Sequence, residues 1–395
     1  MKNYLITILL LTSFVVACNN ANDKIHFLGD IKDSSEVIDV SNVLSTGTYS
    51  IEPFIDSIKI IKLESNNFSI LSDIRQIITT SDKIYVLDGM KNGSVALFNI
   101  DGSFIRRLPI GAAPHEISLA ERIFGDQNDS ILYVYDQGTK RIVKYSSEGD
   151  YISYDQESIL FVDFAVFDGK YVLCNLGFQN SLGQFTIIVK DSIGFDYNIL
   201  GNGWKNSISL PYIQYTERGC LVTNEGDDFI YCYDGQRIYK RYKIVDSNSD
   251  FDIAMYENPE EMVDALPSDV FVFDRFFIET QDFQIFDLVC KSKTAYSTFL
   301  RKRISTSVIA IDYEQTLFNA FEYCPKIGVH NYQDNIFNAV VTYESLHGKC
   351  FGSDEPRWDG SNMGGLISDA DMEKLRNMKP DDNPIIVLFK LKDDI

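Results

Sequence analysis

The chain has 395 residues, of which 45% are hydrophobic, and its 36 basic and 57 acidic side chains give a formal net charge of −21. The hydrophobic share excludes a disordered chain. The negative charge excludes a nucleic-acid binder, because no basic surface is left to neutralise phosphates. Aromatic residues make up 13% of the chain, which favours β-structure.

The first residues have the features of an export signal. Lys2 precedes an apolar stretch, 4–17, that is too short to cross a hydrocarbon core of roughly 30 Å. This stretch ends in Val-Val-Ala-Cys, which resembles a bacterial lipobox, where the cysteine is acylated and becomes the new N-terminus. A secretory peptide cut by the general signal peptidase is the alternative. The sequence thus predicts a signal peptide at 1–17, lipidation at Cys18 and a lipid-anchored tether at 18–50 that leads into the fold.

From about residue 55 the chain shows a repeating pattern of β-strands. The clearest unit combines KIYVLD (83–88), SVALFNI (94–100) and SFIRRL (103–108), with an Asp-Gly turn between the last two. Related segments follow at ILYVYD (131–136), RIVKYS (141–146), KYVLCN (170–175), CLVTNE (220–225), FFIETQ (276–281) and DNIFNAVVTY (334–343). A period of about 40 to 50 residues with about four strands is typical of β-propeller blades. A β-sandwich or barrel is the alternative, but neither repeats an Asp-ended strand and an X-Gly turn.

Two short helices are predicted within this pattern, at 258–266 and from Ser368 to about residue 378. The second lies just before the strand NPIIVLFKLK (383–392), which is predicted to pair with SIKIIKLES (57–65), since a propeller ring must join its two ends. The predicted fold class is therefore all-β: a six-bladed β-propeller over 51–395, with a short C-terminal helix inserted before the closing strand.

These segments resemble the six-bladed β-propeller lipoproteins of Bacteroidota, an NHL-like and mostly uncharacterised family. The resemblance rests on FIDSIKIIKLES, DKIYVLD, LFNIDGSFIRRLPIG, PHEI and DDNPIIVLFKLK, and it covers about residues 35–395. Members often carry a G-x-G-P-G-E-Y-like loop after the first blade, of which Gly111, Pro114 and Glu116 remain here. The resemblance implies a fold and a location in the cell envelope, with the outer membrane as the expected site, and it implies no activity.

Propeller topology places the candidate ligand-binding residues on one face. The connections from the second to the third strand of a blade, and from one blade to the next, emerge on the same side of the ring. The residues that share this side, either at the ends of second strands or in the 110–118 loop, are Asp88, Asp136, Asn175, Asn224, His115 and Glu116. Two alternatives remain open: strand-terminal Asp residues also form turns with their own loop, and a lone loop His is often simply exposed.

Other candidate residues allow more than one interpretation. The acidic loops at 224–228 and 354–360 offer oxygen ligands for calcium but lack EF-hand spacing, so solvated charge is the alternative. Trp204 and Trp358 fit either stacking on a sugar or packing. The six cysteines after Cys18 are predicted to be buried thiols, with a cross-strand Cys220–Cys232 disulfide as the alternative.

No nucleophile elbow, phosphate-binding loop, dinucleotide fingerprint or Cys/His metal spacing is present in the sequence. The sequence therefore predicts a non-enzymatic binding or scaffold module without a cofactor, anchored to the membrane through Cys18, for a glycan, peptide or envelope-protein partner. The alternative is a propeller enzyme, a lyase or lactonase-type hydrolase, with a metal near the central channel.

Overall fold

The protein is described here by a computed structural model that covers residues 33–41, 43, 48–89, 93–125, 131–157, 159–175, 186–190, 195–200, 212–224, 227–256, 259–290, 293–305, 307–312, 316–348 and 357–393. The predicted signal peptide 1–17, Cys18, Trp204 and residues 354–356 of the 354–360 loop lie outside these residues. In this part of the chain no helix has both the length and the apolar character needed to cross a membrane.

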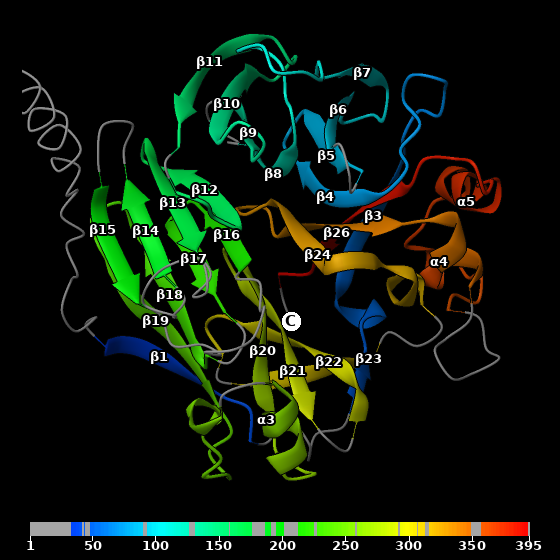
Figure 1. The fold of residues 1–395 in the computed structure, drawn as a ribbon. Coiled ribbons are helices and arrows are strands. Elements are labelled where there is room, and N and C mark those ends of the chain that lie inside the picture. The colour runs from blue at the N-terminus through cyan, green and yellow to red at the C-terminus, as the bar shows by residue number, and fades with distance from the viewer. Residues whose placement is uncertain are drawn as a thin grey trace, which may run out of the picture.

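Six antiparallel sheets are arranged in a ring, which confirms the predicted all-β class and the six-bladed β-propeller (Figure 1). We name the strands of each blade a to d from the axis outward. The six a strands are neighbours around the axis: β4, β8, β12, β16, β20 and β24. The a–b and c–d turns lie on one side of the ring, and the b–c and inter-blade connections lie on the other; we call these the a–b face and the b–c face.

The first three blades follow the chain from inner to outer strand. Blade 1 consists of β4 (Ile74–Thr79), β5 (Lys83–Asp88), β6 (Ser94–Asn99) and β7 (Phe104–Arg107). Blade 2 consists of β8 (Ala120–Gly125), β9 (Ile131–Asp136), β10 (Arg141–Ser146) and β11 (Tyr151–Gln156). Blade 3 consists of β12 (Asp163–Phe167), β13 (Lys170–Asn175), β14 (Thr186–Lys190) and β15 (Phe195–Leu200).

The last three blades also take in strands from the N-terminal part of the chain. Blade 4 consists of β16 (Tyr212–Thr216), β17 (Gly219–Thr223), β18 (Phe229–Tyr233) and β19 (Ile238–Val245). Blade 5 consists of β20 (Val272–Glu279), β21 (Phe283–Cys290), β22 (Lys293–Lys302) and β23 (Val308–Asp312). Blade 6 consists of β24 (Glu322–Asn331), β25 (Ile336–Val341), β26 (Ile385–Leu391) and β3 (Ile55–Lys62).

Blade 6 closes the ring as predicted, because β3 pairs with β26 in antiparallel register, with Ile60 opposite Val387 and Ile58 opposite Phe389. Phe389 packs against Phe337 with ring centroids 5.3 Å apart and against Phe318 at 4.8 Å. Joining the two ends of the chain within one sheet removes the exposed edges that an open ring would have.

Part of the predicted 18–50 tether is ordered on the outside of the ring. β1 (Asp33–Asp39) pairs in parallel with β19, and β2 (Thr48–Ser50) pairs in parallel with β23. Each adds a fifth strand to its blade, and Glu36 of β1 also forms an ion pair of 2.5 Å with Arg301. β1 and β2 thus cover the outer edges of blades 4 and 5.

The helices are short. They comprise α3 (Pro259–Ala265), α4 (Tyr343–His347), α5 (Asp369–Arg376) and the 3-10 turns η1 (Glu52–Phe54), η3 (Ile253–Met255), η4 (Leu317–Ala320) and η5 (Met363–Gly365). α5 is the predicted helix before the closing strand; the hydroxyl of Ser368 caps it by accepting the N–H of Asp371. Lys374 of this helix donates to the carbonyl of Ile60, which ties α5 to blade 6.

Cys174, Cys220, Cys232 and Cys290 are buried thiols outside any disulfide, as the sequence predicted. The alternative Cys220–Cys232 disulfide is wrong. Cys220 lies opposite Tyr233 and Cys232 lies opposite Leu221, so the pairing is offset by one residue from a hairpin centred on Gly226. That offset turns the two side chains to opposite faces of blade 4.

Candidate functional site

A cavity of about 200 Å³ lies on the axis of the ring. The inner strands β4, β8, β12, β16 and β24, together with β25, supply most of its wall. Its aromatic side chains are Phe124, Phe164, Tyr212, Tyr215 and Tyr332. Its polar side chains include Arg75, Gln76, Asp163, Gln214 and Asn338. A concave site with apolar walls and a few polar groups is the usual form of a ligand pocket.

A chain of alternating charges runs along three inner strands beside this cavity. Arg75 makes two hydrogen bonds to the carboxylate of Glu121, at 2.7 and 3.2 Å. Arg122 lies between Glu121, at 3.5 Å, and Asp163, at 3.8 Å. These four side chains come from β4, β8 and β12 and are only 15–23% exposed, so their charges are partly shielded from solvent.

Asp163 is the carboxylate of this row of charged side chains that lines the cavity. Its Oδ1 accepts the N–H of Phe164 at 3.0 Å, and its Oδ2 accepts the N–H of Ile213 in the next blade at 3.2 Å. Burial raises the pKa of Asp163 to about 6, against the opposing effect of Arg122 and these two N–H groups. A carboxylate has about four lone-pair sites, so each oxygen can accept one more hydrogen bond from a ligand.

Glutamine side chains join neighbouring blades along the inner wall, because each amide both donates to and accepts from the backbone of one residue in the next blade. Gln76 accepts the N–H of Ile123 and donates to its carbonyl, both at 2.9 Å, which joins blade 1 to blade 2. Gln214 does the same with Glu279, at 2.7 and 2.6 Å, and so joins blade 4 to blade 5. Asn338 donates to the hydroxyl of Thr79 at 2.6 Å between blades 6 and 1. The polar groups of the cavity wall are thereby fixed in position.

Asp88 and Asp136, two of the predicted ligand-binding residues, hold loops in place. Oδ1 of Asp88 accepts the backbone N–H groups of Ser72 and Asp73, at 2.7 and 2.9 Å, while Oδ2 pairs with Arg107. Asp136 repeats the arrangement in blade 2: it accepts two N–H groups, those of residues 118 and 119, and pairs with an arginine of β10 at 3.2 Å. Both aspartates are buried, so their geometry favours anchoring the loop that enters their own blade over direct contact with a ligand.

His115 and Glu116 lie in a tightly closed loop next to the outer strands of blade 2. Glu116 accepts the N–H of Ala113 at 2.9 Å, and its carboxylate fills the space where a Cβ on Gly111 would come within 2.0 Å. This contact explains why glycine and glutamate occur together in the loop. The side chain of His115 is 57% exposed, and its ring lies 6.5 Å from that of Tyr151. His115 is therefore available for a partner at the rim of the ring.

Asn175 and Asn224 are both buried at the ends of b strands. The Oδ1 atom of Asn175 accepts no hydrogen bond from the described residues. The cavity wall contains none of the six predicted residues within the described part of the chain. The predicted residues therefore do not line the axial cavity, although Asp88 lies opposite Ile74 of its wall.

Burial decides two further interpretations: it supports the packing alternative for Trp358 and contradicts the solvated-charge alternative for Asp227. Trp358 is 8% exposed, its indole N–H donates to the carbonyl of Ser361, and it packs in the core of blades 5 and 6, so it is not a surface for sugar stacking. Asp227 is also buried, where it accepts the hydroxyl of Tyr231 at 2.7 Å, and burial raises its pKa to about 7. It is therefore not a solvated loop charge. Its neighbour Asp228 pairs with Lys243 at 3.2 Å.

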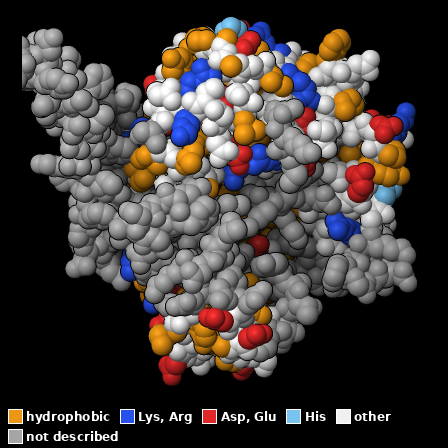
Figure 2. Space-filling model, viewed as in Figure 1, with side chains coloured by type: hydrophobic (Ala, Val, Ile, Leu, Met, Phe, Trp, Pro, Cys, Tyr) orange, Lys and Arg blue, Asp and Glu red, His pale blue; other side chains and the backbone are white. Residues whose placement is uncertain are grey.

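Acidic side chains also gather around the connection between blades 4 and 5. Figure 2 shows Asp and Glu side chains at the end of the molecule that carries α3. A second cavity of about 280 Å³ there is lined by Asp228, Asp246, Asp250 and Asp252 together with Lys243. Within the described residues, however, no three His, Cys, Asp or Glu side chains are arranged to hold a metal ion.

The residues of the cavity wall were missed because they interrupt the inner strands with polar side chains. β4 (IRQIIT), β8 (AERIFG) and β16 (YIQYT) neither alternate cleanly nor form an apolar run. One signal was available: a Gln or charged residue recurs in the short strand that precedes each predicted Asp-ended strand. In a propeller that strand is the innermost one.

The fold and cavity define a six-bladed β-propeller with an axial pocket. The chain belongs to the family described as a domain of unknown function, DUF4934, whose model matches residues 35–390. No curated protein matches the chain in sequence.

The chain is similar to two solved structures from Bacteroides. One, from Bacteroides fragilis NCTC 9343, is named as an exported protein; it is 14% identical, with a TM-score of 0.66, and the match covers 91% of this chain and all (100%) of that one. Another, a member of the DUF4221 family from Bacteroides vulgatus ATCC 8482, is 10% identical with a TM-score of 0.46 over 86% of this chain and 97% of that one. At these identities the likeness concerns the fold alone.

Proposed function

We propose that this protein is a lipid-anchored binding or scaffold module of the cell envelope, whose axial cavity receives part of a glycan, peptide or envelope-protein ligand. The observation that carries the proposal is the half-buried carboxylate of Asp163, 15% exposed in a cavity lined by aromatic rings. Partly buried groups with a perturbed pKa inside a pocket are typical of functional sites.

The size of the cavity limits what can enter it. About 200 Å³ is less than the roughly 300–1,000 Å³ of pockets for drug-sized molecules. One sugar ring or one peptide side chain of a larger ligand fits this volume. Aromatic rings such as Tyr212 and Phe124 offer apolar faces to such a unit, while Asp163 and Arg75 offer an acceptor and a donor.

The envelope location rests on the sequence before residue 19 and on the exported relative. The lipobox-like Val-Val-Ala-Cys18 supports lipidation, and the resemblance to NHL-like lipoproteins supports a location in the cell envelope. The Bacteroides fragilis protein with this fold is named as exported, which agrees with a location outside the cytoplasm. We propose the outer membrane as the anchoring site.

The alternative, a propeller lyase or lactonase with a metal near the channel, has less support. Its metal needs several oxygen or nitrogen ligands, and the described residues contain no group of three that could supply them. A rise in melting temperature on titration with calcium or zinc would favour this alternative.

Replacing the lipidated cysteine tests the anchor. Cys18→Ser removes the sulfur that takes the acyl chains, so the variant should leave the membrane fraction and appear as soluble protein or as uncleaved precursor. Fractionation after a high-salt wash measures this. Unchanged partition into membranes would show that the protein is held there by something other than the lipid.

Replacing the cavity carboxylate tests the binding site. A ligand found by screening glycan and peptide arrays should bind Asp163→Asn at least about tenfold more weakly, because one charge-assisted hydrogen bond contributes about 1.5–3 kcal/mol. The comparison variant is His115→Ala with Glu116→Ala, in the loop that the sequence indicated, and its affinity should stay within about twofold. Loss of binding only in the loop variant would place the site at the rim of the ring.

The folding control for Asp163→Asn depends on pH. The pKa of Asp163 is raised to about 6, above the value of about 3.9 expected in an unfolded chain, so the folded protein binds the extra proton. Deprotonation therefore lowers the stability of the natural protein as the pH rises from about 4 to 6. Relative to it, the Asn variant should gain stability over that range and keep the gain at pH 7. Weaker binding together with this gain cannot come from misfolding.

A further inference from the structure

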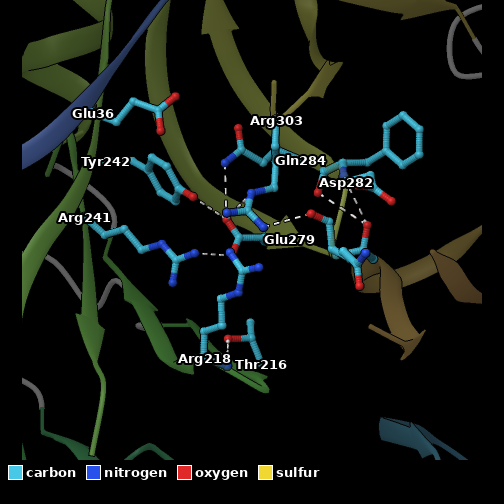
Figure 3. A network of polar contacts seen from close by, with 12 residues as sticks. Glu36, Thr216, Arg218, Arg241, Tyr242, Glu279, Asp282, Gln284 and Arg303 are labelled. Carbon is cyan, nitrogen blue, oxygen red and sulfur yellow. Dashed lines mark hydrogen bonds and ion pairs between the residues drawn. The ribbon is translucent and has the colours of Figure 1, made fainter. Parts of the chain in front are cut away.

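On the a–b face, next to the axial cavity, three arginines converge on one carboxylate (Figure 3). Glu279, at the end of β20, is fully buried (0% exposed). Arg241 donates to its Oε1 at 2.7 Å, Tyr242 donates to its Oε2 at 2.5 Å, and the Nε of Arg303 lies 3.6 Å from the same Oε2. Gln284 adds a further bond to Oε2 at 3.2 Å. The carboxylate is therefore held by four protein side chains.

Arg218, the third arginine, is differently placed. It lies in the a–b turn of blade 4, is exposed, and directs its guanidinium towards Glu279 (Figure 3). The structure gives that guanidinium no hydrogen bond or ion pair within the described part of the chain, although its charge acts on Tyr332. Its five N–H donors are thus free to meet a ligand.

Arg303 and Tyr332 present further donors at the same place. The Nη1 atom of Arg303 donates to the carbonyl of Gln281 at 2.8 Å and to the hydroxyl of Tyr332 at 3.3 Å. Since Tyr332 accepts in that contact, its own O–H is left to donate, and its side chain lines the axial cavity. Arg303 is 18% exposed and so remains in reach of a molecule at this end of the channel.

Charges of both signs surround these donors. Burial and Glu279 raise the pKa of Tyr332, while Arg303, Arg218 and Arg241 oppose that rise. Two other carboxylates are near in the chain: Asp282 accepts the side-chain N–H of Asn335 at 2.8 Å, and Glu217 is exposed. Within the described residues neither forms an ion pair with the three arginines. Within the described residues Glu279 is thus the carboxylate that pairs with these arginines, through Arg241 and Arg303, and Arg218 is left without an ion pair.

We propose that Arg218, Arg303 and Tyr332 form a binding subsite for an anionic oxygen group, a carboxylate, sulfate or phosphate monoester, at the a–b end of the axial channel. The planar fork of arginine matches two oxygens of such a group, and a phenol O–H can bind a third. The subsite is independent of the ligand proposed for the cavity, because an inorganic anion alone can occupy it.

The test is a titration of the full-length protein at constant ionic strength with sodium sulfate, sodium phosphate and D-glucuronate, and with D-glucose as the neutral probe. Calorimetry gives the affinities, and the Nε–H signals of the arginines in NMR spectra locate the binding. Saturable binding of at least one anion and none of glucose is expected, and the tightest anion identifies the group. Arg218→Gln should lower the affinity for that anion at least about tenfold, which corresponds to the loss of one charge-assisted hydrogen bond.

The matched control is Arg237→Gln. Arg237 lies in the c–d turn of the same blade and on the same face, with a side chain 66% exposed and paired with Asp234 at 3.5 Å. Its removal changes the net charge equally and should leave the affinity unchanged. Arg303→Lys keeps the charge but loses the planar guanidinium, so it should lower the affinity for the anion, whereas Arg237→Gln should not. The proposal of this subsite would be overturned if no anion bound, or if Arg218→Gln and Arg237→Gln lost equal affinity for the anion.

Discussion

A chain that lacks residues 384–395 is expected to lose its cooperative unfolding transition and to aggregate. The deletion removes β26, which lies between β25 and β3 in blade 6. It takes away the buried side chains of Ile385, Ile386, Val387, Leu388, Phe389 and Leu391. Each contributes roughly 1.5–3 kcal/mol when fully buried. Their sum is comparable to the whole free energy of unfolding of a domain, about 5–15 kcal/mol.

Circular dichroism and size-exclusion chromatography measure this result. Deleting only residues 394–395 is the control, since β26 ends at Leu391, and its melting temperature should not change. Phe389→Ala is a milder variant, expected to cost about 3–5 kcal/mol because it leaves a cavity among Phe318, Phe321 and Phe337. A monomeric 384–395 deletion with an unchanged melting temperature would mean that the ring does not depend on this strand.

Glu279→Gln should cause a large loss of stability. The change leaves Arg241, whose side chain is 11% exposed, without its carboxylate partner. Removing one member of a buried ion pair typically costs about 3–5 kcal/mol, because the remaining charge is neither solvated nor paired. The side chain of Glu279 also joins blades 4 and 5 through Arg241 and Tyr242, so its loss weakens the contact between blades as well as the pair. Chemical denaturation of the purified protein measures the loss.

The control for Glu279 is an exposed pair of similar geometry. Asp150, 70% exposed, lies 3.0 Å from Arg106, and exposed pairs contribute about 0–1 kcal/mol. Asp150→Asn should therefore shift the denaturation midpoint only slightly. If the two variants lost equal stability, the burial of Glu279 would not have the energetic role described.

The repeating b and c strands could be predicted from the sequence because they are buried on both faces. KIYVLD and ILYVYD form continuous apolar runs with an Asp at the end, and β5 and β9 occupy those residues. The closing pair was predictable for a similar reason, since 57–65 and 383–392 are strongly apolar and the topology requires a partner for each.

The inner strands and their cavity were not predictable from local pattern. Their polar side chains are satisfied only across blade boundaries, by residues far away in the chain: Gln76 by Ile123, 47 positions on, and Gln214 by Glu279, 65 positions on. The same holds for β1 and β2, whose parallel partners lie in blades 4 and 5. Long-range pairing of this kind leaves no short-range periodicity to detect.

The predicted site residues illustrate the same limit. Asp88 and Asp136 were correctly placed on the b–c face, but the sequence did not show that their carboxylates bind the N–H groups of the preceding loop. Asp163, in contrast, lies within an ordinary stretch, FVDFAVF. Its pKa is raised only by burial in the folded ring, which outweighs the opposing effect of Arg122 and of the N–H of Ile213.

The most direct measurement is a crystal structure of the protein with a ligand obtained from the glycan and peptide screen. Density for one unit of that ligand is expected in the axial cavity, in contact with Asp163 and flanked by Tyr212 and Phe124. Density at the 110–118 loop beside His115, with the axial cavity free of ligand, would contradict this expectation.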